Sequence, residues 1–168
     1  MSLLNEEIAV AARDALAACE EMGVTLATAE SCTGGLVSAA LTTVPGSSRV
    51  FEAGFVTYAN SAKETILNVA PSLIRTQGAV SRDVAFAMAR GALAHTSAKV
   101  AVAITGIAGP DGGTEEKPVG LVHIAVCSED GDSLHDAPVF TGDRDSVRAQ
   151  ATLLALRMIA RVLREGTV

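Results

Sequence analysis

The sequence predicts an α/β fold: a three-layer sandwich in which helices cover a mixed, mostly parallel sheet, with an antiparallel hairpin near the C-terminus. Short apolar runs alternate with helix-length segments for most of the 168 residues, an order typical of parallel sheets. Hydrophobic residues make up 49% of the chain and aromatic residues only 3%, which suits helices packed closely on strands of small β-branched residues. The turn signal EDGD separates two strand-like runs near the end.

The first half of the chain alternates between helix and strand patterns. Its predicted elements are a helix over 4–22, a strand over 24–30, a helix over 34–44, a strand over 50–58 and a helix over 61–69. Gly23 provides a stop for the first helix. Ser61 and Glu64 have the spacing of a capping box, which predicts Ser61 as the N-cap of the last of these helices.

The second half begins with a helix over 81–95, for which Ser81 is the expected N-cap. A strand over 99–105, a glycine-rich loop over 106–118, and hairpin strands over 119–127 and 133–141 follow. The final helix runs from 143 to 164, with Asp143 or Thr141 as its cap. We find no repeat or long linker, so residues 1–168 are expected to form one domain.

Composition excludes several classes of function. The net charge of −6 and the lack of a basic block argue against direct nucleic-acid binding. Cys19, Cys32 and Cys127 are odd in number and have no CxxC spacing, which indicates reduced thiols in a cytosolic protein. We expect a soluble, cytoplasmic protein, because no secretory signal or membrane-length apolar run is present. The three histidines are isolated, so we expect no metal site.

A first polar cluster, Glu30 to Gly35 (ESCTGG), directly follows a predicted strand. In open α/β sheets, ligands bind beyond the carboxyl ends of strands. Ser31 could attack a carbonyl carbon while backbone N–H groups hold the oxyanion. Alternatively, Ser31 or Thr33 only caps the next helix and the glycines serve packing. Cys32 is a weaker nucleophile candidate, because no histidine lies near it in the sequence.

A second cluster, TYANSAK, contains Tyr58, Asn60 and Lys63. A lysine with a pKa lowered by burial can act as general base for a serine. The alternative is an exposed lysine on a helix and a tyrosine that packs at a strand end.

The third cluster is the loop TGIAGPDGG at 105–113, which has neither Walker A nor G-x-G-x-x-G spacing. Its glycines can bring backbone N–H groups to a phosphate or carboxylate, or the segment is a plain surface loop. Arg144 and Arg148 lie four residues apart at the start of the last helix. They share a helix face and either clamp a phosphate or form a solvated basic pair.

The motifs AESCTGG, TYANSAK, AITGIAGPDGG and FTGDR, in this order, resemble the CinA C-terminal domain family across nearly the whole chain. That family includes nicotinamide-nucleotide amidases, and this chain resembles its stand-alone form, without the additional N-terminal domain of many members. Ala59 departs from the family pattern Y-[ST]-N-x-x-K. The resemblance implies a homo-oligomer, expected to be a dimer.

The resemblance implies hydrolysis of the carboxamide of nicotinamide mononucleotide to nicotinic acid mononucleotide and ammonia, in pyridine-nucleotide salvage, without cofactor or metal. Ser31 would be the nucleophile, and Lys63 or Tyr58 would take its proton; the sequence does not separate these two. The N–H groups of residues 33–35 would stabilise the oxyanion, and the glycine loop and Arg144 would hold ribose and phosphate. The implied substrate-binding residues are Glu30, Thr33, Gly34, Gly35, Asn60, Thr105, Gly106, Ala108, Gly109, Gly112 and Arg144.

Three other functions remain as alternatives. A non-catalytic nucleotide-binding module would keep the glycine loop and Arg144 without a meeting of Ser31 and Lys63. A short-chain oxidoreductase is suggested by Tyr58 and Lys63, but their spacing of five and the missing glycine fingerprint disfavour it. An accessory protein in DNA uptake or damage response is disfavoured, as a direct DNA binder, by the acidic charge.

Overall fold

The five strands form one mixed sheet in the order β2-β1-β3-β4-β5 in the computed structural model, which describes residues 4–131 and 133–166. β1 (Leu26–Glu30) pairs in parallel with both β2 (Phe51–Val56) and β3 (Val100–Gly106). β4 (Val122–Ser128) and β5 (Ser133–Asp136) extend the sheet as an antiparallel hairpin beside β3. The mixed sheet and its C-terminal hairpin are therefore confirmed.

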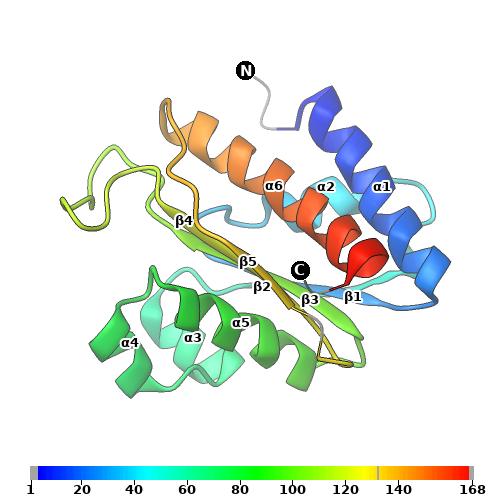
Figure 1. The fold of residues 1–168 in the computed structure, drawn as a ribbon, viewed down its shortest axis with the longest axis horizontal. Helices are drawn as coiled ribbons and strands as arrows, with labels where there is room; N and C mark the ends of the chain where they lie inside the picture. The colour runs from blue at the N-terminus through cyan, green and yellow to red at the C-terminus, as the bar shows by residue number, and fades with distance from the viewer. Residues whose placement is uncertain (1–3, 132, 167–168) are drawn as a thin grey trace.

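Helices cover both faces of this sheet, which gives the three layers that the sequence predicts (Figure 1). One layer consists of α1 (Glu6–Met22), α2 (Leu36–Thr42) and α6 (Arg144–Glu165). The opposite layer consists of α3 (Asn60–Leu67), α4 (Pro71–Gln77) and α5 (Arg82–Ala94). A short 3₁₀ turn, Ser47–Arg49, precedes β2.

The central strands carry small apolar side chains because both of their faces are covered. Every residue of β1 is buried, and so is β3 except for its last residue, Gly106. One core cluster lies towards α1, α2 and α6 and includes Leu156 and Ile159. The other lies towards α3, α4 and α5 and includes Met88. Gly91 allows close packing there, since a Cβ at this position would collide with the backbone of Leu67.

Helix ends follow the local signals in three places. Gly23 ends α1 in the left-handed conformation, with φ of 65°. The Ser81 hydroxyl accepts a hydrogen bond from the Val84 N–H at 3.3 Å, as an N-cap of α5 does. The Asp143 carboxylate accepts from the Ser146 N–H at 2.8 Å, so Asp143 and not Thr141 caps α6.

The predicted capping box at Ser61 and Glu64 is wrong. α3 begins at Asn60, and the preceding Ala59 makes no side-chain cap. The carbonyl of Ala59 already accepts from the N–H of Lys63 at 3.2 Å, so the helix is under way before Ser61 can cap it. Ser61 is an exposed residue of the first turn.

Two further elements differ from the sequence prediction. α4, which begins with Pro71 at its first position, is absent from the predicted elements. The strand predicted over 133–141 ends at Asp136. The chain beyond it continues alongside the segment before β4 through an isolated bridge at Val139: the Pro138 carbonyl accepts from the Val122 N–H at 3.1 Å, and the Phe140 N–H donates to the Gly120 carbonyl at 2.9 Å. Proline has no N–H to continue the ladder.

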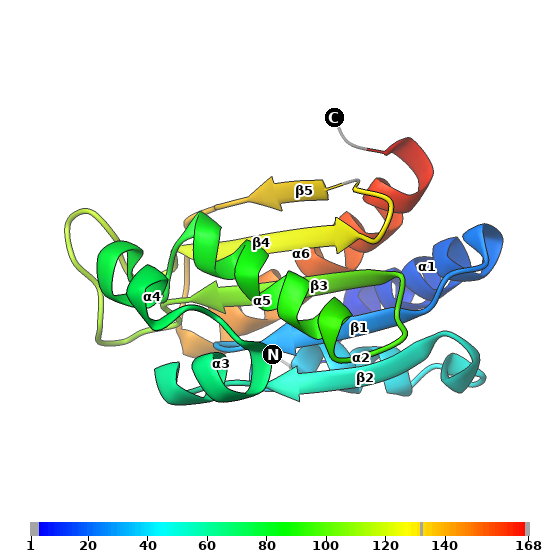
Figure 2. The ribbon, with the colours of Figure 1, turned by 90° about the horizontal axis from the view of Figure 1, so that it is seen from below.

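The topology brings the polar clusters to one edge of the sheet. β1, β2 and β3 point in the same direction, towards the end where the loop 106–118 extends (Figure 2).

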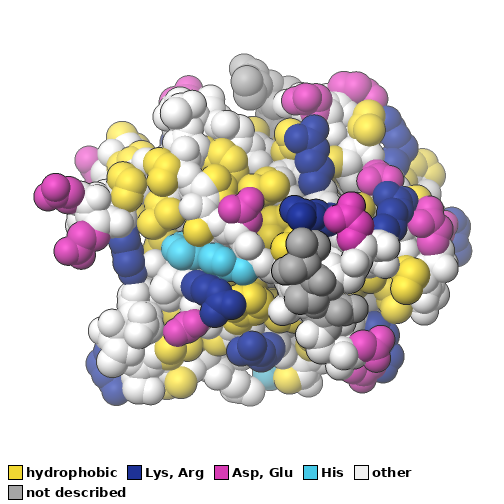
Figure 3. Space-filling model, viewed as in Figure 1, with side chains coloured by type: hydrophobic (Ala, Val, Ile, Leu, Met, Phe, Trp, Pro, Cys, Tyr) yellow, Lys and Arg dark blue, Asp and Glu magenta, His cyan; other side chains and the backbone are white. Residues whose placement is uncertain are grey.

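Charged side chains of both signs are interspersed on the face of the molecule that Figure 3 shows. No helix of the described residues is long and apolar enough to cross a membrane.

Candidate active site

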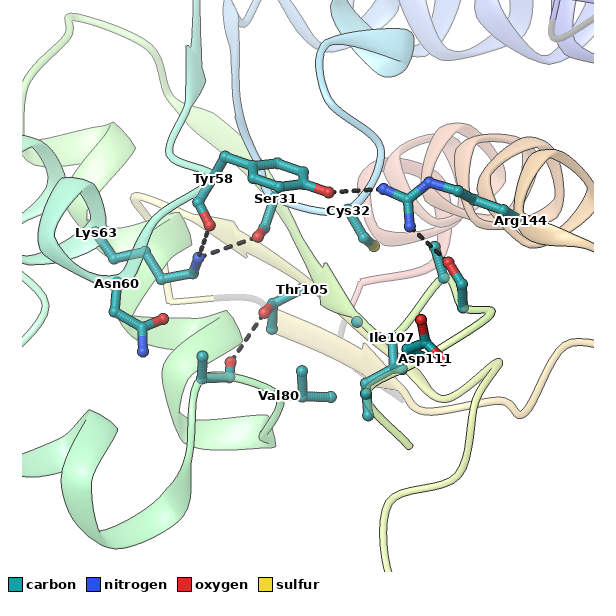
Figure 4. A pocket seen from close by; sticks show the side chains of 15 residues that line it. Ser31, Cys32, Tyr58, Asn60, Lys63, Val80, Thr105, Ile107, Asp111 and Arg144 are labelled. Atoms are coloured by element: carbon teal, nitrogen blue, oxygen red, sulfur yellow. Dashed lines mark hydrogen bonds between the residues drawn. The ribbon is translucent and has the colours of Figure 1, made fainter. Parts of the chain in front are cut away.

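A pocket of about 290 Å³ lies at the carboxyl ends of β1 and β3. Its wall comes from the segment after β1, the start of α3, the glycine loop after β3, and the first residue of α6 (Figure 4). The predicted site residues in this wall are Ser31, Tyr58, Asn60, Lys63, Thr105, Gly106, Ala108, Gly109, Gly112 and Arg144. Segments more than 100 residues apart thus form one cavity, at the position that parallel strands favour.

Ser31 and Lys63 meet in the buried part of this pocket. The Lys63 Nζ lies 3.0 Å from the Ser31 Oγ. Ser31 is fixed by its backbone N–H, which donates to the Ile104 carbonyl of β3 at 2.9 Å. The Lys63 Nζ also donates to the carbonyls of Thr57 at 2.8 Å and Tyr58 at 3.4 Å. A hydroxyl and an amine are therefore held at hydrogen-bonding distance, the arrangement that a serine–lysine pair requires.

Lys63 is 1% exposed, and no carboxylate of the described residues forms an ion pair with it. Burial disfavours the ammonium form and lowers the pKa of Lys63 below its usual value. Its position in the first turn of α3 acts in the same direction through the helix dipole, by less than about 1 kcal/mol. Both effects destabilise the ammonium form of Lys63 relative to the neutral amine.

Tyr58 reaches across the pocket mouth to Arg144 (Figure 4). Its hydroxyl accepts a hydrogen bond from the Arg144 guanidinium at 2.7 Å, and the same guanidinium donates to the Gly109 carbonyl at 2.7 Å. Tyr58 is 59% exposed. No carboxylate of the described residues pairs with Arg144, so this cation at the pocket rim is open to an anionic ligand.

Thr105 and Asn60 add polar groups to the wall. Thr105 is 1% exposed, and its hydroxyl donates to the Ala79 carbonyl at 2.9 Å, which ties the end of β3 to the segment before α5. Asn60 is exposed at the start of α3. The pocket therefore combines a buried basic end with a hydrogen-bonding, partly exposed rim.

Four residues that the resemblance assigns to substrate binding do not line the pocket: Glu30, Thr33, Gly34 and Gly35. Successive side chains of a strand point to opposite faces, so Glu30 points away from Ser31. Its carboxylate lies under α2 and accepts from the Val37 N–H at 2.6 Å. The Gly34 N–H donates to the Ser31 carbonyl at 3.0 Å, which removes it from the expected oxyanion donors.

Arg144 and Arg148 do not form a joint phosphate clamp. Arg144 lines the pocket, but Arg148 is absent from its wall and donates instead to the carbonyls of Cys32 and Thr33, at 3.1 and 3.2 Å. The two arginines lie on the same side of α6, but Arg148 binds the backbone of the neighbouring loop instead of facing the pocket.

Five wall residues are not among the predicted catalytic and substrate-binding residues: Cys32, Ala79, Val80, Ile107 and Asp111. Asp111 lies within the motif TGIAGPDGG, and its carboxylate next to glycines was a usable signal. Ala79 and Val80 carry no chemical signal. Cys32 was considered only as a nucleophile, and burial raises the pKa of its thiol to about 11, so the thiol stays protonated.

His123 and His135 are distant in the sequence but adjacent in the sheet. Their ring nitrogens Nδ1 and Nε2 lie 3.0 Å apart, because the β4–β5 hairpin places the two side chains together. Within residues 4–131 and 133–166, no group of three or more His, Cys, Asp or Glu side chains could hold a metal ion.

A family model and individual known proteins match most of this chain. The family model "CinA C-terminal domain" matches residues 8–163. The Escherichia coli (strain K12) protein named nicotinamide-nucleotide amidohydrolase PncC is 47% identical over 150 residues, covering 89% of this chain and 91% of that protein. A CinA-like protein of Geobacter sulfurreducens is 50% identical over 143 residues. This chain spans only about a third of that relative, since the match covers 34% of its length.

Solved structures give the same result. The crystal structure of the competence/damage inducible protein CihA from Agrobacterium tumefaciens superposes with a TM-score of 0.90 at 46% identity, covering 94% of this chain and 96% of that one. A CinA superfamily protein from Klebsiella pneumoniae superposes with a TM-score of 0.89 at 33% identity. The chain therefore belongs to the CinA C-terminal domain family.

Proposed function

We propose that this protein is a nicotinamide-nucleotide amidase that hydrolyses the carboxamide of nicotinamide mononucleotide to nicotinic acid mononucleotide and ammonia. The observation that carries the proposal is the 3.0 Å contact between the Ser31 hydroxyl and a buried amine with a lowered pKa. The relatives named PncC, with similar length and 47% identity, support the choice of substrate.

In this proposal, Lys63 is the general base. A neutral amine has two N–H bonds and one lone pair. The carbonyls of Thr57 and Tyr58 accept the two N–H bonds, which leaves the lone pair for the proton of Ser31. The competing base, Tyr58, is less suited, because its hydroxyl contacts Arg144 across the pocket mouth, whereas the Lys63 amine contacts the Ser31 hydroxyl.

The reaction then proceeds in two steps. The Ser31 Oγ attacks the amide carbon while its proton passes to Lys63, and the resulting ammonium returns the proton to the amide nitrogen as the C–N bond breaks. Ammonia leaves and an ester on Ser31 remains. A water molecule then gives a proton to Lys63 and attacks the ester carbon, the bond between this carbon and the Ser31 Oγ breaks, and the Lys63 ammonium returns the proton to the Oγ. We assign the oxyanion to the N–H of Cys32, the residue after the nucleophile.

Recognition of the nucleotide falls to the pocket rim. Arg144 has no carboxylate partner among the described residues and projects from α6 over the glycine loop, where a phosphate can add to its contacts with Tyr58 and Gly109. Asn60 lies beside Lys63 in the wall and offers an amide to the carboxamide of the substrate.

The 3.0 Å contact also bears on the non-catalytic alternative. A nucleotide-binding module has no need of a buried amine against a serine hydroxyl, and burying a lysine without an ion pair is costly. The geometry therefore favours the enzyme over the binding module.

The test is ammonia release from nicotinamide mononucleotide by the wild type, Ser31→Ala and Ser61→Ala. We expect Ser31→Ala to lower kcat by roughly 1,000-fold or more. Ser61 is exposed on α3 outside the pocket wall, so Ser61→Ala should keep full activity. Full activity in Ser31→Ala would refute the nucleophile assignment, and an inactive wild type would favour the binding module.

A further inference from the structure

Arg148 connects α6 to the loop that carries the nucleophile. Its Nε donates to the Cys32 carbonyl at 3.1 Å and its NH2 group donates to the Thr33 carbonyl at 3.2 Å. These are the two residues directly after Ser31. One guanidinium thus fixes two successive peptide groups next to the proposed nucleophile, across a sequence separation of 115 residues and more.

The contact is built into the fold. The Arg148 side chain is only 21% exposed, and its remaining NH1 group lies 3.7 Å from the Asp145 carboxylate. Gly34 completes the fit: its φ of 60° is left-handed, and a Cβ there would lie 3.3 Å from the Arg148 NH2 group. Gly34 therefore lets the loop approach the guanidinium closely, in a backbone conformation that glycine adopts without strain.

Arg148 differs from Arg144, which lies one helical turn earlier. Arg144 lines the pocket and reaches Tyr58 and Gly109. Arg148 is absent from the pocket wall, so a substrate in the pocket has no direct contact with it. Any effect of Arg148 on the reaction must pass through the loop.

We propose that Arg148 is a positioning residue that holds the loop after Ser31, and thereby keeps the Ser31 hydroxyl aligned with Lys63. The role in catalysis rests on the amidase function proposed above. Arginine presents its Nε and NH2 donors in a rigid planar fork, whereas a lysine carries all of its donors on one nitrogen at the end of a flexible chain. Arg148→Lys should therefore weaken the hydrogen bonds to the carbonyls of Cys32 and Thr33.

The kinetic test compares Arg148→Ala and Arg148→Lys with Arg157→Ala, an exposed arginine further along α6. Displacement of a nucleophile by about 1 Å costs about 100-fold in rate. We expect Arg148→Ala to lower kcat by about that factor with KM within threefold, whereas Arg157→Ala stays at wild-type values. Arg148→Lys should fall in between, and added guanidinium ion should restore part of the activity of Arg148→Ala. A kcat within twofold of wild type in both Arg148 variants would overturn the proposal.

A second measurement does not depend on amidase activity. Hydrogen exchange of the backbone amides in 31–37 should be faster in Arg148→Lys and Arg148→Ala than in wild type, by about tenfold, and unchanged in Arg157→Ala. If the wild type proved inactive on the nucleotide, faster exchange would still establish the tether and only the proposed function would fail. Unchanged exchange in Arg148→Lys would refute the proposal that Arg148 holds this loop. This outcome can be read even if Arg148→Ala fails to fold.

Discussion

Glu30 and Lys63 are both almost completely buried at the same edge of the sheet, with 0% and 1% of their surface exposed. They do not form a salt bridge with each other in the described structure. Burial disfavours the charged form of both groups. It therefore raises the pKa of Glu30 to about 7 and lowers the pKa of Lys63.

The two side chains differ in what they face. Glu30 lies under α2, where its carboxylate accepts from the Val37 N–H. Lys63 faces the hydroxyl of Ser31 in the wall of an open pocket. A shifted pKa is therefore evidence of burial, and it indicates catalysis only where the group also touches a nucleophile that a substrate can reach. We expect mutations of Glu30 to change stability and mutations of Lys63 to change the reaction.

The largest effect should come from Lys63→Met, which keeps most of the length of the unbranched side chain and removes the base. We expect kcat to fall by about 100- to 10,000-fold, the usual contribution of a general base. The carbonyls of Thr57 and Tyr58 lose a donor, so the unfolding free energy should fall by no more than about 3 kcal/mol. Ammonia release and urea unfolding measure the two quantities. Lys99→Met, at an exposed position, is the control. Activity of Lys63→Met within tenfold of wild type would show that Lys63, like Glu30, has no role in the reaction.

Glu30→Gln should leave activity intact and change the pH dependence of stability. Because the pKa of Glu30 is about 7 in the folded protein and about 4.5 unfolded, the folded state binds the extra proton between these values. Raising the pH through this window therefore destabilises the wild type, by up to about 3 kcal/mol. Glutamine cannot ionise and keeps an oxygen for the Val37 N–H.

Urea unfolding of both proteins between about pH 4 and pH 8 tests this expectation. The unfolding free energy of Glu30→Gln should rise relative to that of the wild type as the pH increases. A constant difference across the range would show that burial does not raise the pKa of Glu30. A loss of ammonia release beyond tenfold would place Glu30 in the reaction and erase the contrast with Lys63.

Arg144→Gln extends the comparison to an exposed charge at the pocket rim. Loss of a charged hydrogen bond to phosphate should raise KM for nicotinamide mononucleotide by about 10- to 100-fold, with a smaller change in kcat. Nicotinamide riboside, which lacks the phosphate, provides the matched control in steady-state kinetics. Equal losses for the two substrates would show that Arg144 does not bind the phosphate.

The smallest effect belongs to Ser61→Ala. A true N-cap loses about 1 kcal/mol on such a change. Ser61 lies inside the first turn of α3, so we expect the unfolding free energy to change by less than about 0.5 kcal/mol. Urea unfolding measures it, and a loss near 1 kcal/mol would restore the cap that the sequence pattern suggests.

Local signals made most of the fold predictable. Ser81 and Asp143 cap their helices as expected, and the alternation of elements gave the layers and the hairpin. The failures are also local. The Ser61 pattern matched a capping box by residue type, but α3 begins at Asn60, so its N-cap is Ala59, two residues before Ser61, and no side chain caps it. Propensity alone fixes helix boundaries poorly, because the packing of neighbouring elements decides where a turn starts.

The candidate site was predictable only at the level of clusters. The motifs identified Ser31, Lys63 and Arg144, which all line the pocket. They also suggested Glu30, whose side chain points away from the pocket because side chains alternate along β1. The contacts of Arg148 with the nucleophile loop span more than 100 residues, and no spacing rule reaches that far. Such contacts follow from helix packing.

The most direct test of the account is the pKa of the Lys63 amine itself. The chain has only three lysines, so an NMR pH titration of ¹³C-labelled lysine side chains can follow each one, with Lys63→Met for assignment. We predict a pKa for Lys63 below the usual value of about 10.4, because burial disfavours the ammonium and a neutral amine is needed to take the proton of Ser31. A Lys63 pKa at or above that usual value would contradict it, because an amine that stays protonated cannot take the proton of Ser31.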